Sequence, residues 1–153
     1  RVTDAERITH TSMVPLQFSK ILDAEPEGAD GSSIAAMMSA GSPLFPDLKR
    51  RLLERFGPAM IELYGLTEGV ITTLDPETAE DRLSSVGQPL LGTDICIVGN
   101  NDEILEHGMS GEIVATGRIV MPGYWNQPDK TKECEWVAPD GTVWLRTGVS
   151  RCP

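Results

Sequence analysis

Cysteines, basic residues and long apolar runs are all scarce in this sequence, and each shortage excludes a class of protein. The 3 cysteines, Cys96, Cys134 and Cys152, cannot all pair with one another, and they show no CxxC or Cys/His spacing typical of metal sites. We interpret them as structural or idle thiols of a reducing compartment. No run approaches the roughly 18 apolar residues of a transmembrane helix, and the opening RVTDAERITH holds no apolar signal core. We therefore expect a cytoplasmic protein with no transmembrane segment.

The charge balance excludes another class of partner. The chain has 13 Lys and Arg residues against 23 Asp and Glu residues, a formal net charge of −10, and no basic run. Such a surface repels the phosphate backbone of nucleic acids, so we expect no nucleic-acid partner. Small molecules or proteins suit this charge better. A hydrophobic content of 40% is enough apolar material for one core.

Short apolar runs alternate with amphipathic helices in the first half of the chain. The second helix has the clearest signals, because Pro46 suits a first helical position, Asp47 lies in the first turn and Gly57 follows the end. This alternation is typical of an α/β fold with parallel strands. In chain order the predicted elements are a β-prone segment at 9–15, a helix from Pro15, a strand at 34–38, the helix from Pro46 and a strand at 59–63.

The second half follows a different pattern, in which strands are divided by turn residues. Pro139-Asp140-Gly141 lies between two β-prone runs, which predicts a hairpin, and the segment before it can hold one short helix. Three further strands are predicted, at 94–98, 103–105 and 112–116. We therefore expect part of a wound, mostly parallel α/β sheet with flanking helices over residues 1–83, followed by a small β-barrel-like subdomain over residues 84–153.

Two polar loops follow strands of the predicted parallel sheet, at the edge where such sheets bind ligands. They are Ser39–Pro43 and Tyr64–Glu68. Gly41 and Gly65 would let the backbone approach a flat ligand closely. A turn at the end of a strand is nevertheless a sufficient structural explanation for either loop taken by itself.

The side chains of the second loop are the parts of a nucleotide site. Tyr64 offers an aromatic face for stacking, Thr67 a hydroxyl donor and Glu68 an oxygen ligand. Together they suit a phosphate group neutralised by a hard cation such as Mg²⁺.

Five segments match a known pattern in order and rough spacing: SAGSPLFPDLKRRLLERFG (39–57), ELYGLTEG (62–69), SSVGQPLLGTDICIV (84–98), GEIVATGRIVMPGYWNQPDKT (111–131) and WLRTG (144–148). Together they resemble the adenylate-forming superfamily, which includes acyl-CoA synthetases, luciferases and the adenylation domains of peptide synthetases. The acyl- or aryl-CoA synthetase branch is the most similar. The resemblance runs from near residue 8 to residue 148.

This resemblance implies an enzyme, an ATP-dependent acid–thiol ligase of the AMP-forming type. Such a ligase joins a small-molecule carboxylic acid to the α-phosphate of ATP, releases pyrophosphate and passes the acyl group to coenzyme A, with Mg²⁺ as the metal. The residues implied at the adenine are Gly41, Ser42, Pro43, Tyr64 as the stacking ring and Gly65 beneath it.

The resemblance also implies the catalytic and substrate-binding residues. Thr67 would donate a hydrogen bond to the α-phosphate, and Glu68 would hold Mg²⁺. Both groups would stabilise the negative charge that develops on the phosphoryl oxygens. The acyl pocket would be lined by small or apolar residues, each of which is more often part of a plain core: Met13, Val14, Ala40, Gly69 and Val70.

The match fails after RTG, where the superfamily has an aspartate that binds both ribose hydroxyls. Val149 stands there, and a valine side chain cannot accept those hydrogen bonds. The continuation SRCP is also unlike the superfamily, so we interpret both ends of the chain as cut, by truncation or a shift of reading frame. The superfamily's phosphate loop and mobile lysine domain are missing. We expect this piece alone to be inactive, and its exposed sheet edge to favour self-association.

Two alternatives stay open. The chain could belong to an adenylation domain that loads an amino or aryl acid onto a carrier protein, or it could be a non-catalytic remnant that has kept the fold. The sequence does not identify the carboxylic acid, or decide between CoA and a carrier protein as the acceptor.

Overall fold

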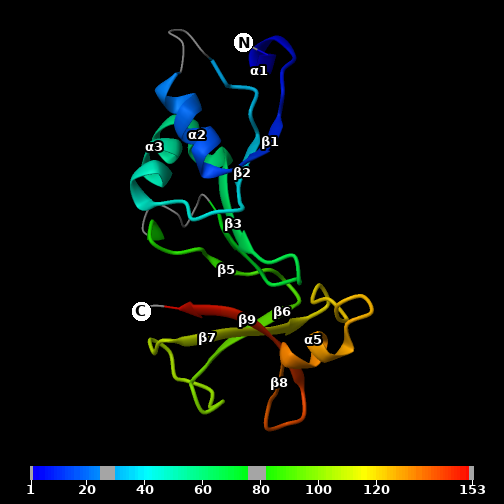
Figure 1. Cartoon of the computed structure of the whole chain (residues 1–153). Helices are drawn as coiled ribbons and strands as arrows, with labels where there is room; N and C mark the ends of the chain where they lie inside the picture. The colour runs from blue at the N-terminus through cyan, green and yellow to red at the C-terminus, as the bar shows by residue number, and fades with distance from the viewer. Residues whose placement is uncertain (1, 25–29, 76–81, 152–153) are drawn as a thin grey trace. The chain divides into compact units, whose positions relative to one another are not determined.

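The computed structural model describes residues 2–24, 30–75 and 82–151 of the chain (Figure 1). Cys152 and the end of the SRCP segment lie outside this described part. The chain divides into two compact units. Unit 1 comprises residues 1–65 and 72–88, and unit 2 comprises residues 66–71 and 89–153. The boundary predicted from the sequence between residues 83 and 84 stays a prediction.

Unit 1 is built on a sheet whose strand order is β1-β2-β3-β4-β5. The first three strands pair in parallel, which confirms the expected α/β arrangement. β4 follows β3 through a five-residue turn closed by a hydrogen bond from Leu66 N to Val70 O at 2.9 Å, so these two strands form a hairpin. The bounds are β1 (His10–Met13), β2 (Ala36–Ser39), β3 (Met60–Gly65), β4 (Ile71–Leu74) and β5 (Gln88–Pro89).

Proline sets the start of both longer helices of unit 1, because its fixed φ suits the first helical position. These helices are α2 (Pro15–Asp23) and α3 (Pro46–Phe56), and both were expected from the sequence. A short helix α1 (Val2–Ala5) precedes them, and a 3₁₀ turn η1 (Gly57–Ala59) follows α3. The apolar core joins α2 and α3 to the sheet and contains Phe18, Met37, Leu44, Leu52 and Met60.

A buried ion pair lies beside this core. Lys49 of α3 contacts Glu62 of β3, and their side chains are only 3% and 7% exposed. Lys49 Nζ also donates to the carbonyl oxygen of Ser85 at 2.9 Å. Burial raises the pKa of the Glu62 carboxyl, and hydrogen bonds from Lys49 and the backbone of Leu44 partly oppose that rise. The pair therefore links α3, β3 and the segment that leads to β5.

Unit 2 contains an antiparallel sheet of strand order β6-β7-β9-β8. The hairpin predicted around Pro139-Asp140-Gly141 is confirmed as β8 and β9, whose Trp136 and Trp144 rings meet edge to face at 6.1 Å. The predicted short helix is confirmed as α5. The bounds are β6 (Thr93–Val98), β7 (Gly111–Gly117), α5 (Pro128–Glu133), β8 (Glu135–Val137) and β9 (Val143–Arg151).

Two expectations for unit 2 need correction or restriction. The strand expected at 103–105 is reduced to one isolated bridge between Val98 and Ile104. The bridge joins only this one pair of residues, so the segment forms a loop. In the described residues β6 and β8 are the two outer strands, and closure into a barrel stays a prediction. No helix in the described part of the chain is long and apolar enough to span a membrane.

Candidate functional site

The loop Ser39–Pro43 begins where β2 ends. The backbone N–H of Ala40 donates to Met13 O at 3.3 Å, which ties the start of the loop to the end of β1. Gly41 has a φ of +87°, a left-handed conformation that favours glycine at this turn. Gly41, Ser42 and Pro43 are all exposed. The loop therefore presents its backbone to solvent at the carboxyl end of the parallel strands.

Tyr64 and Gly65 lie at the carboxyl end of β3. Gly65 is exposed and Tyr64 is half-buried. Among the described residues the buried phenol oxygen of Tyr64 has no hydrogen-bond partner, and burial raises the pKa of this phenol.

Thr67, Glu68 and Gly69 form the tip of the β3–β4 turn and belong to unit 2. Thr67 is exposed and Glu68 is half-buried. Gly69 has a φ of +106°, and a Cβ atom at this position would overlap the backbone carbonyl of Ile119. Glycine is required here because the turn packs directly on the backbone of the β7–α5 loop.

One side-chain contact of Glu68 was not predicted from the sequence. The Tyr124 hydroxyl donates to Glu68 Oε1 at 2.9 Å, although the two residues are 56 positions apart. This hydrogen bond raises the pKa of Tyr124 to about 12. The sequence indicated Tyr124 only as part of the segment 111–131 that carries the family resemblance, because no local signal shows which carboxylate a distant phenol meets.

A cavity of about 320 Å³ in unit 2 opens beside this pair. Arg146, Thr147 and Gly148 of the RTG segment line it together with Glu68 and Tyr124. Further lining residues are Leu66, Glu112, Glu133 and Cys134. The structure thus brings Glu68 and the RTG segment to one cavity.

The RTG segment is held by Glu112 of β7. Arg146 Nη1 lies 2.5 Å from Glu112 Oε2, and the other end of the guanidinium contacts Asp102. The backbone N–H of Gly148 donates to Glu112 Oε1 at 3.0 Å. Val149, the residue after this segment, is half-buried in β9 and donates its N–H to Thr147 Oγ1 at 3.1 Å.

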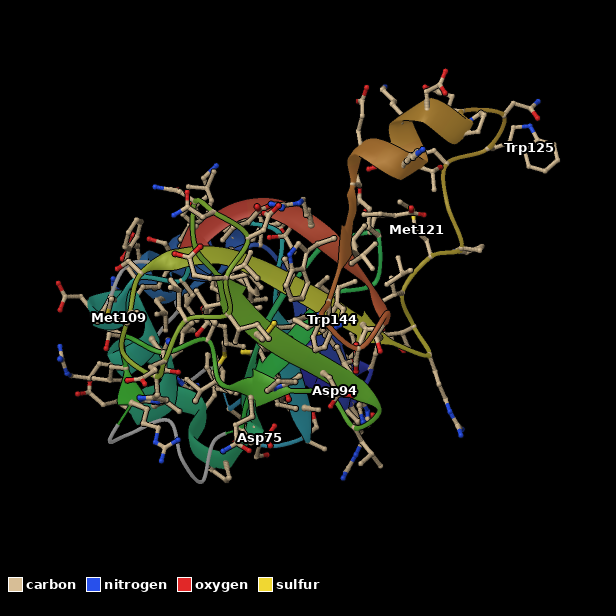
Figure 2. The ribbon with its side chains drawn as sticks, turned by 90° about the horizontal axis from the view of Figure 1, so that it is seen from below. Asp75, Asp94, Met109, Met121, Trp125 and Trp144 are labelled. Atoms are coloured by element: carbon tan, nitrogen blue, oxygen red, sulfur yellow. The ribbon has the colours of Figure 1, made fainter. Side chains whose placement is uncertain are left out.

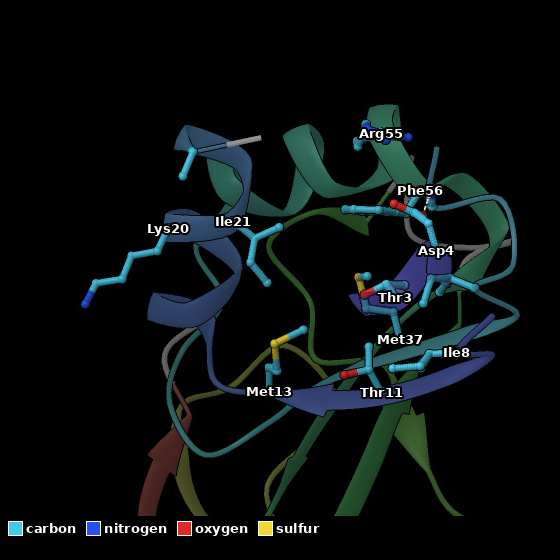
Figure 3. A pocket seen from close by; sticks show the side chains of 13 residues that line it. Thr3, Asp4, Ile8, Thr11, Met13, Lys20, Ile21, Met37, Arg55 and Phe56 are labelled. Atoms are coloured by element: carbon cyan, nitrogen blue, oxygen red, sulfur yellow. Dashed lines mark hydrogen bonds between the residues drawn. The ribbon is translucent and has the colours of Figure 1, made fainter. Parts of the chain in front are cut away.

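The five expected acyl-pocket residues are divided between the two units. Met13 lines a cavity of about 380 Å³ in unit 1, where Figure 3 shows its side chain together with those of Ile21, Met37 and Phe56. Val14 is exposed, Ala40 is half-buried and Gly69 is buried. Val70 is fully buried and packs with Ala115 and Leu145 in a core cluster of unit 2. Their shared role in an acyl pocket stays a prediction.

The carboxylate oxygens of Glu68 suit a hard cation that takes most of its other ligands from water and phosphate. Within the described residues no group of three or more His, Cys, Asp or Glu side chains could hold a metal ion. One Glu68 carboxylate oxygen accepts from Tyr124, and the described residues provide no donor to the other. Mg²⁺ is commonly bound by one or two carboxylates, with water and phosphate oxygens as its remaining ligands. A single carboxylate that lines a cavity, as Glu68 does, fits that mode.

Comparisons with known proteins identify the family of the chain. The family model of the AMP-binding enzymes matches residues 1–125. Feruloyl-CoA synthase of Amycolatopsis sp is 36% identical over 149 residues, which are 95% of this chain and 29% of that protein. The chain thus spans less than a third of the length of this relative.

Two solved structures show the same fold over 97% of the chain. The amide bond synthetase McbA of Marinactinospora thermotolerans has a TM-score of 0.86 at 27% identity, and the match covers 30% of its chain. O-succinylbenzoate coenzyme A synthetase of Bacillus subtilis, in complex with ATP and magnesium, has a TM-score of 0.80 at 28% identity, and the match again covers 30% of its chain. From the family match and the similar folds, we conclude that this chain belongs to the AMP-binding enzyme family.

Proposed function

We propose that the chain forms the nucleotide-facing part of an ATP-dependent carboxylate–CoA ligase. The observation that carries the proposal is the family match together with the 36% identity to feruloyl-CoA synthase over 95% of the chain. In the proposed reaction a carboxylate attacks the α-phosphate of ATP, pyrophosphate leaves, and the acyl group then passes to the thiol of CoA.

The proposed roles are those that the family resemblance implies, and the exposure of each residue is compatible with them. The exposed backbone of Gly41, Ser42 and Pro43 borders the adenine, and Gly65 closes the turn beneath it. Tyr64 presents the face of its ring to the base, because a half-buried aromatic side chain is a suitable stacking surface. The single cation-binding group we propose is Glu68; Mg²⁺ bound there would neutralise phosphate charge.

Thr67 is proposed to hydrogen-bond an α-phosphate oxygen. Its side chain is exposed at the tip of the turn, so the hydroxyl can reach a ligand. A hydrogen bond to a charged oxygen contributes about 1.5–3 kcal/mol, enough to orient the phosphorus for attack.

The acid and the acceptor are proposed only as classes. Relatives are named as ligases of feruloyl, indoleacetate and medium- or long-chain fatty acyl groups, so we propose an apolar aryl or alkyl acid. Met13, Val14, Ala40, Gly69 and Val70 are the residues of this chain that we propose to border it. The similarity to an amide bond synthetase keeps an amine or a carrier protein as an alternative acceptor.

Val149 is the observation that favours a non-catalytic remnant. A half-buried valine provides no acceptor for the ribose hydroxyls that the family's aspartate would bind. We therefore expect weak nucleotide binding and no measurable ATP–pyrophosphate exchange from the 153-residue chain. Exchange above background with a panel of carboxylic acids would contradict this expectation.

Isothermal titration calorimetry with AMP and with a non-hydrolysable acyl-adenylate analogue tests the proposal. We expect Val149→Asp to tighten binding of both ligands, because the new carboxylate can accept from the ribose. Thr67→Val should weaken binding by about tenfold through the lost hydrogen bond. Thr142→Val, at an exposed threonine of the β8–β9 turn, is the matched control and should change nothing. If neither the wild type nor Val149→Asp binds either ligand, the chain is a remnant without a nucleotide site.

A further inference from the structure

The loop between β7 and α5 holds the Glu68 turn at three points. The backbone N–H of Met121 donates to Glu68 O at 2.8 Å, and the Tyr124 hydroxyl donates to Glu68 Oε1 at 2.9 Å. The third point is the close packing of Gly69 on Ile119. The backbone and the carboxylate of Glu68 are therefore both attached to the same loop.

Tyr124 is itself anchored. Its backbone N–H donates to Thr131 Oγ1 at 2.9 Å, and this hydroxyl donates to Gln127 O at 3.0 Å at the start of α5. The neighbouring Trp125 is 88% exposed, and Figure 2 shows its ring pointing away from the chain. Of the two adjacent aromatic residues, only Tyr124 is directed to the site.

We propose that Tyr124 is a positioning residue for Glu68: its hydroxyl holds one carboxylate oxygen and thereby directs the other toward the cation. This inference rests on the proposed role of Glu68 as the Mg²⁺ ligand.

The physical reason is conformational entropy. A glutamate side chain loses rotamer freedom when it binds a cation, and a rigid phenol that has already fixed the carboxylate reduces that loss. Donors that orient a ligand to a metal typically change metal affinity 10–100-fold when they are removed. The hydrogen bond occupies only one oxygen of the carboxylate. The other oxygen has no donor among the described residues and can therefore bind a cation.

The test is a titration of the full chain with Mn²⁺ alone, with free Mn²⁺ measured by electron paramagnetic resonance. We expect Glu68→Gln to weaken Mn²⁺ binding by more than tenfold and Tyr124→Phe by roughly tenfold. In the double variant Y124F/E68Q, the tyrosine substitution should cause no further loss, because it acts through the carboxylate. Trp125→Phe is the matched control and should bind Mn²⁺ like the wild type.

A second, metal-free measurement separates positioning from a general structural role. The ¹³C signal of the Glu68 carboxyl, assigned by its loss in Glu68→Gln, should shift in Tyr124→Phe and stay in place in Trp125→Phe. If Tyr124→Phe does not fold, Thr131→Val keeps the phenol but removes its backbone anchor, and we expect a smaller loss of Mn²⁺ affinity.

The outcomes distinguish the inference from the proposed function. Normal Mn²⁺ affinity in Tyr124→Phe, with weakened affinity in Glu68→Gln, overturns the positioning role and leaves the metal role of Glu68 standing. The same holds if Tyr124→Phe does not fold and Thr131→Val binds Mn²⁺ normally. Unchanged affinity in Glu68→Gln, or no Mn²⁺ binding by the wild type, overturns both.

Discussion

Both units contain a cation paired with carboxylates, but in opposite environments. In unit 1 the side chains of Lys49 and Glu62 are 3% and 7% exposed and lie beside an apolar core. In unit 2 the Arg146 side chain is 25% exposed, contacts Glu112 and Asp102, and lines the site cavity. Solvent can replace part of the unit 2 contacts, whereas a broken pair in unit 1 leaves a charge without water or partner. The unit 1 pair thus serves the fold, and the unit 2 cluster is placed where a ligand can reach it.

The chain provides separate probes for the two units. All 3 tryptophans, Trp125, Trp136 and Trp144, belong to unit 2, whereas α2 and α3, the two longest helices of the described residues, belong to unit 1. Tryptophan fluorescence therefore reports the unfolding of unit 2. Far-ultraviolet circular dichroism at the helical band mainly reports unit 1.

The largest effect we expect is on the unit 1 core. Phe18 is fully buried, and Phe18→Ala should lower the free energy of unfolding of unit 1 by about 4 kcal/mol. Urea titration should show the loss in the helical signal and a smaller change in fluorescence. Phe45→Ala, at a side chain 72% exposed, is the matched control and should have little effect. Equal losses in both signals would show that the two units unfold as one.

Lys49→Met should destabilise unit 1 by about 3 kcal/mol, because the Glu62 carboxylate is then buried without its partner. The double variant K49M/E62L should recover most of that loss, since both charges are replaced by apolar groups. Urea titration of the three proteins measures the difference. A double variant no more stable than Lys49→Met would contradict this account.

Arg146→Met in unit 2 should cost only about 1 kcal/mol, because the guanidinium is partly exposed and its carboxylates can turn to water. The backbone N–H of Gly148 continues to satisfy Glu112. Fluorescence-detected urea unfolding provides the measurement. A loss as large as that of Lys49→Met would remove the contrast between the two ion pairs.

The smallest effect we expect is a pH dependence of unit 1. Because burial raises the pKa of Glu62 above its ordinary value of 4.5, the folded state holds this proton more tightly than the unfolded state does. The resulting stabilisation is fully present below pH 4.5 and is lost as the pH rises through the pKa of the folded state. Glu62→Gln should remove this contribution. Plots of the free energy of unfolding against pH, measured by circular dichroism, should therefore differ in slope between the wild type and Glu62→Gln above pH 4.5. Parallel curves would show that Glu62 keeps its ordinary pKa.

Much of the fold could be predicted because its signals are local. Pro46 and Gly57 bounded the second helix, which the structure shows as Pro46–Phe56 with Gly57 at a φ of +52°. The turn at Pro139-Asp140-Gly141 marked the β8–β9 hairpin in the same way. The segment at 103–105 was wrongly expected to be a strand, because alternation over three residues carries too little information.

The candidate site was predictable only in part. Thr67 and Glu68 were singled out by their position after a strand, and the structure places them on an accessible turn. Their role in catalysis remains a proposal. The hydrogen bond between Tyr124 and Glu68 was missed, because a tyrosine followed by a tryptophan in a loop usually has only a packing role. Lys49 was missed for a related reason, since a lysine within a charged helix normally faces water.

The sequence by itself determined the parallel α/β beginning, the antiparallel second half, the helix ends and the family resemblance, since these depend on residues a few positions apart. Only the tertiary structure decided that Lys49 is buried on Glu62, that Tyr124 meets Glu68 and that the RTG segment lines the same cavity. The physical reason is that such contacts join residues far apart in the chain. Their partners are selected by packing and by the cost of leaving a buried polar group unpaired, and neither appears in a local pattern.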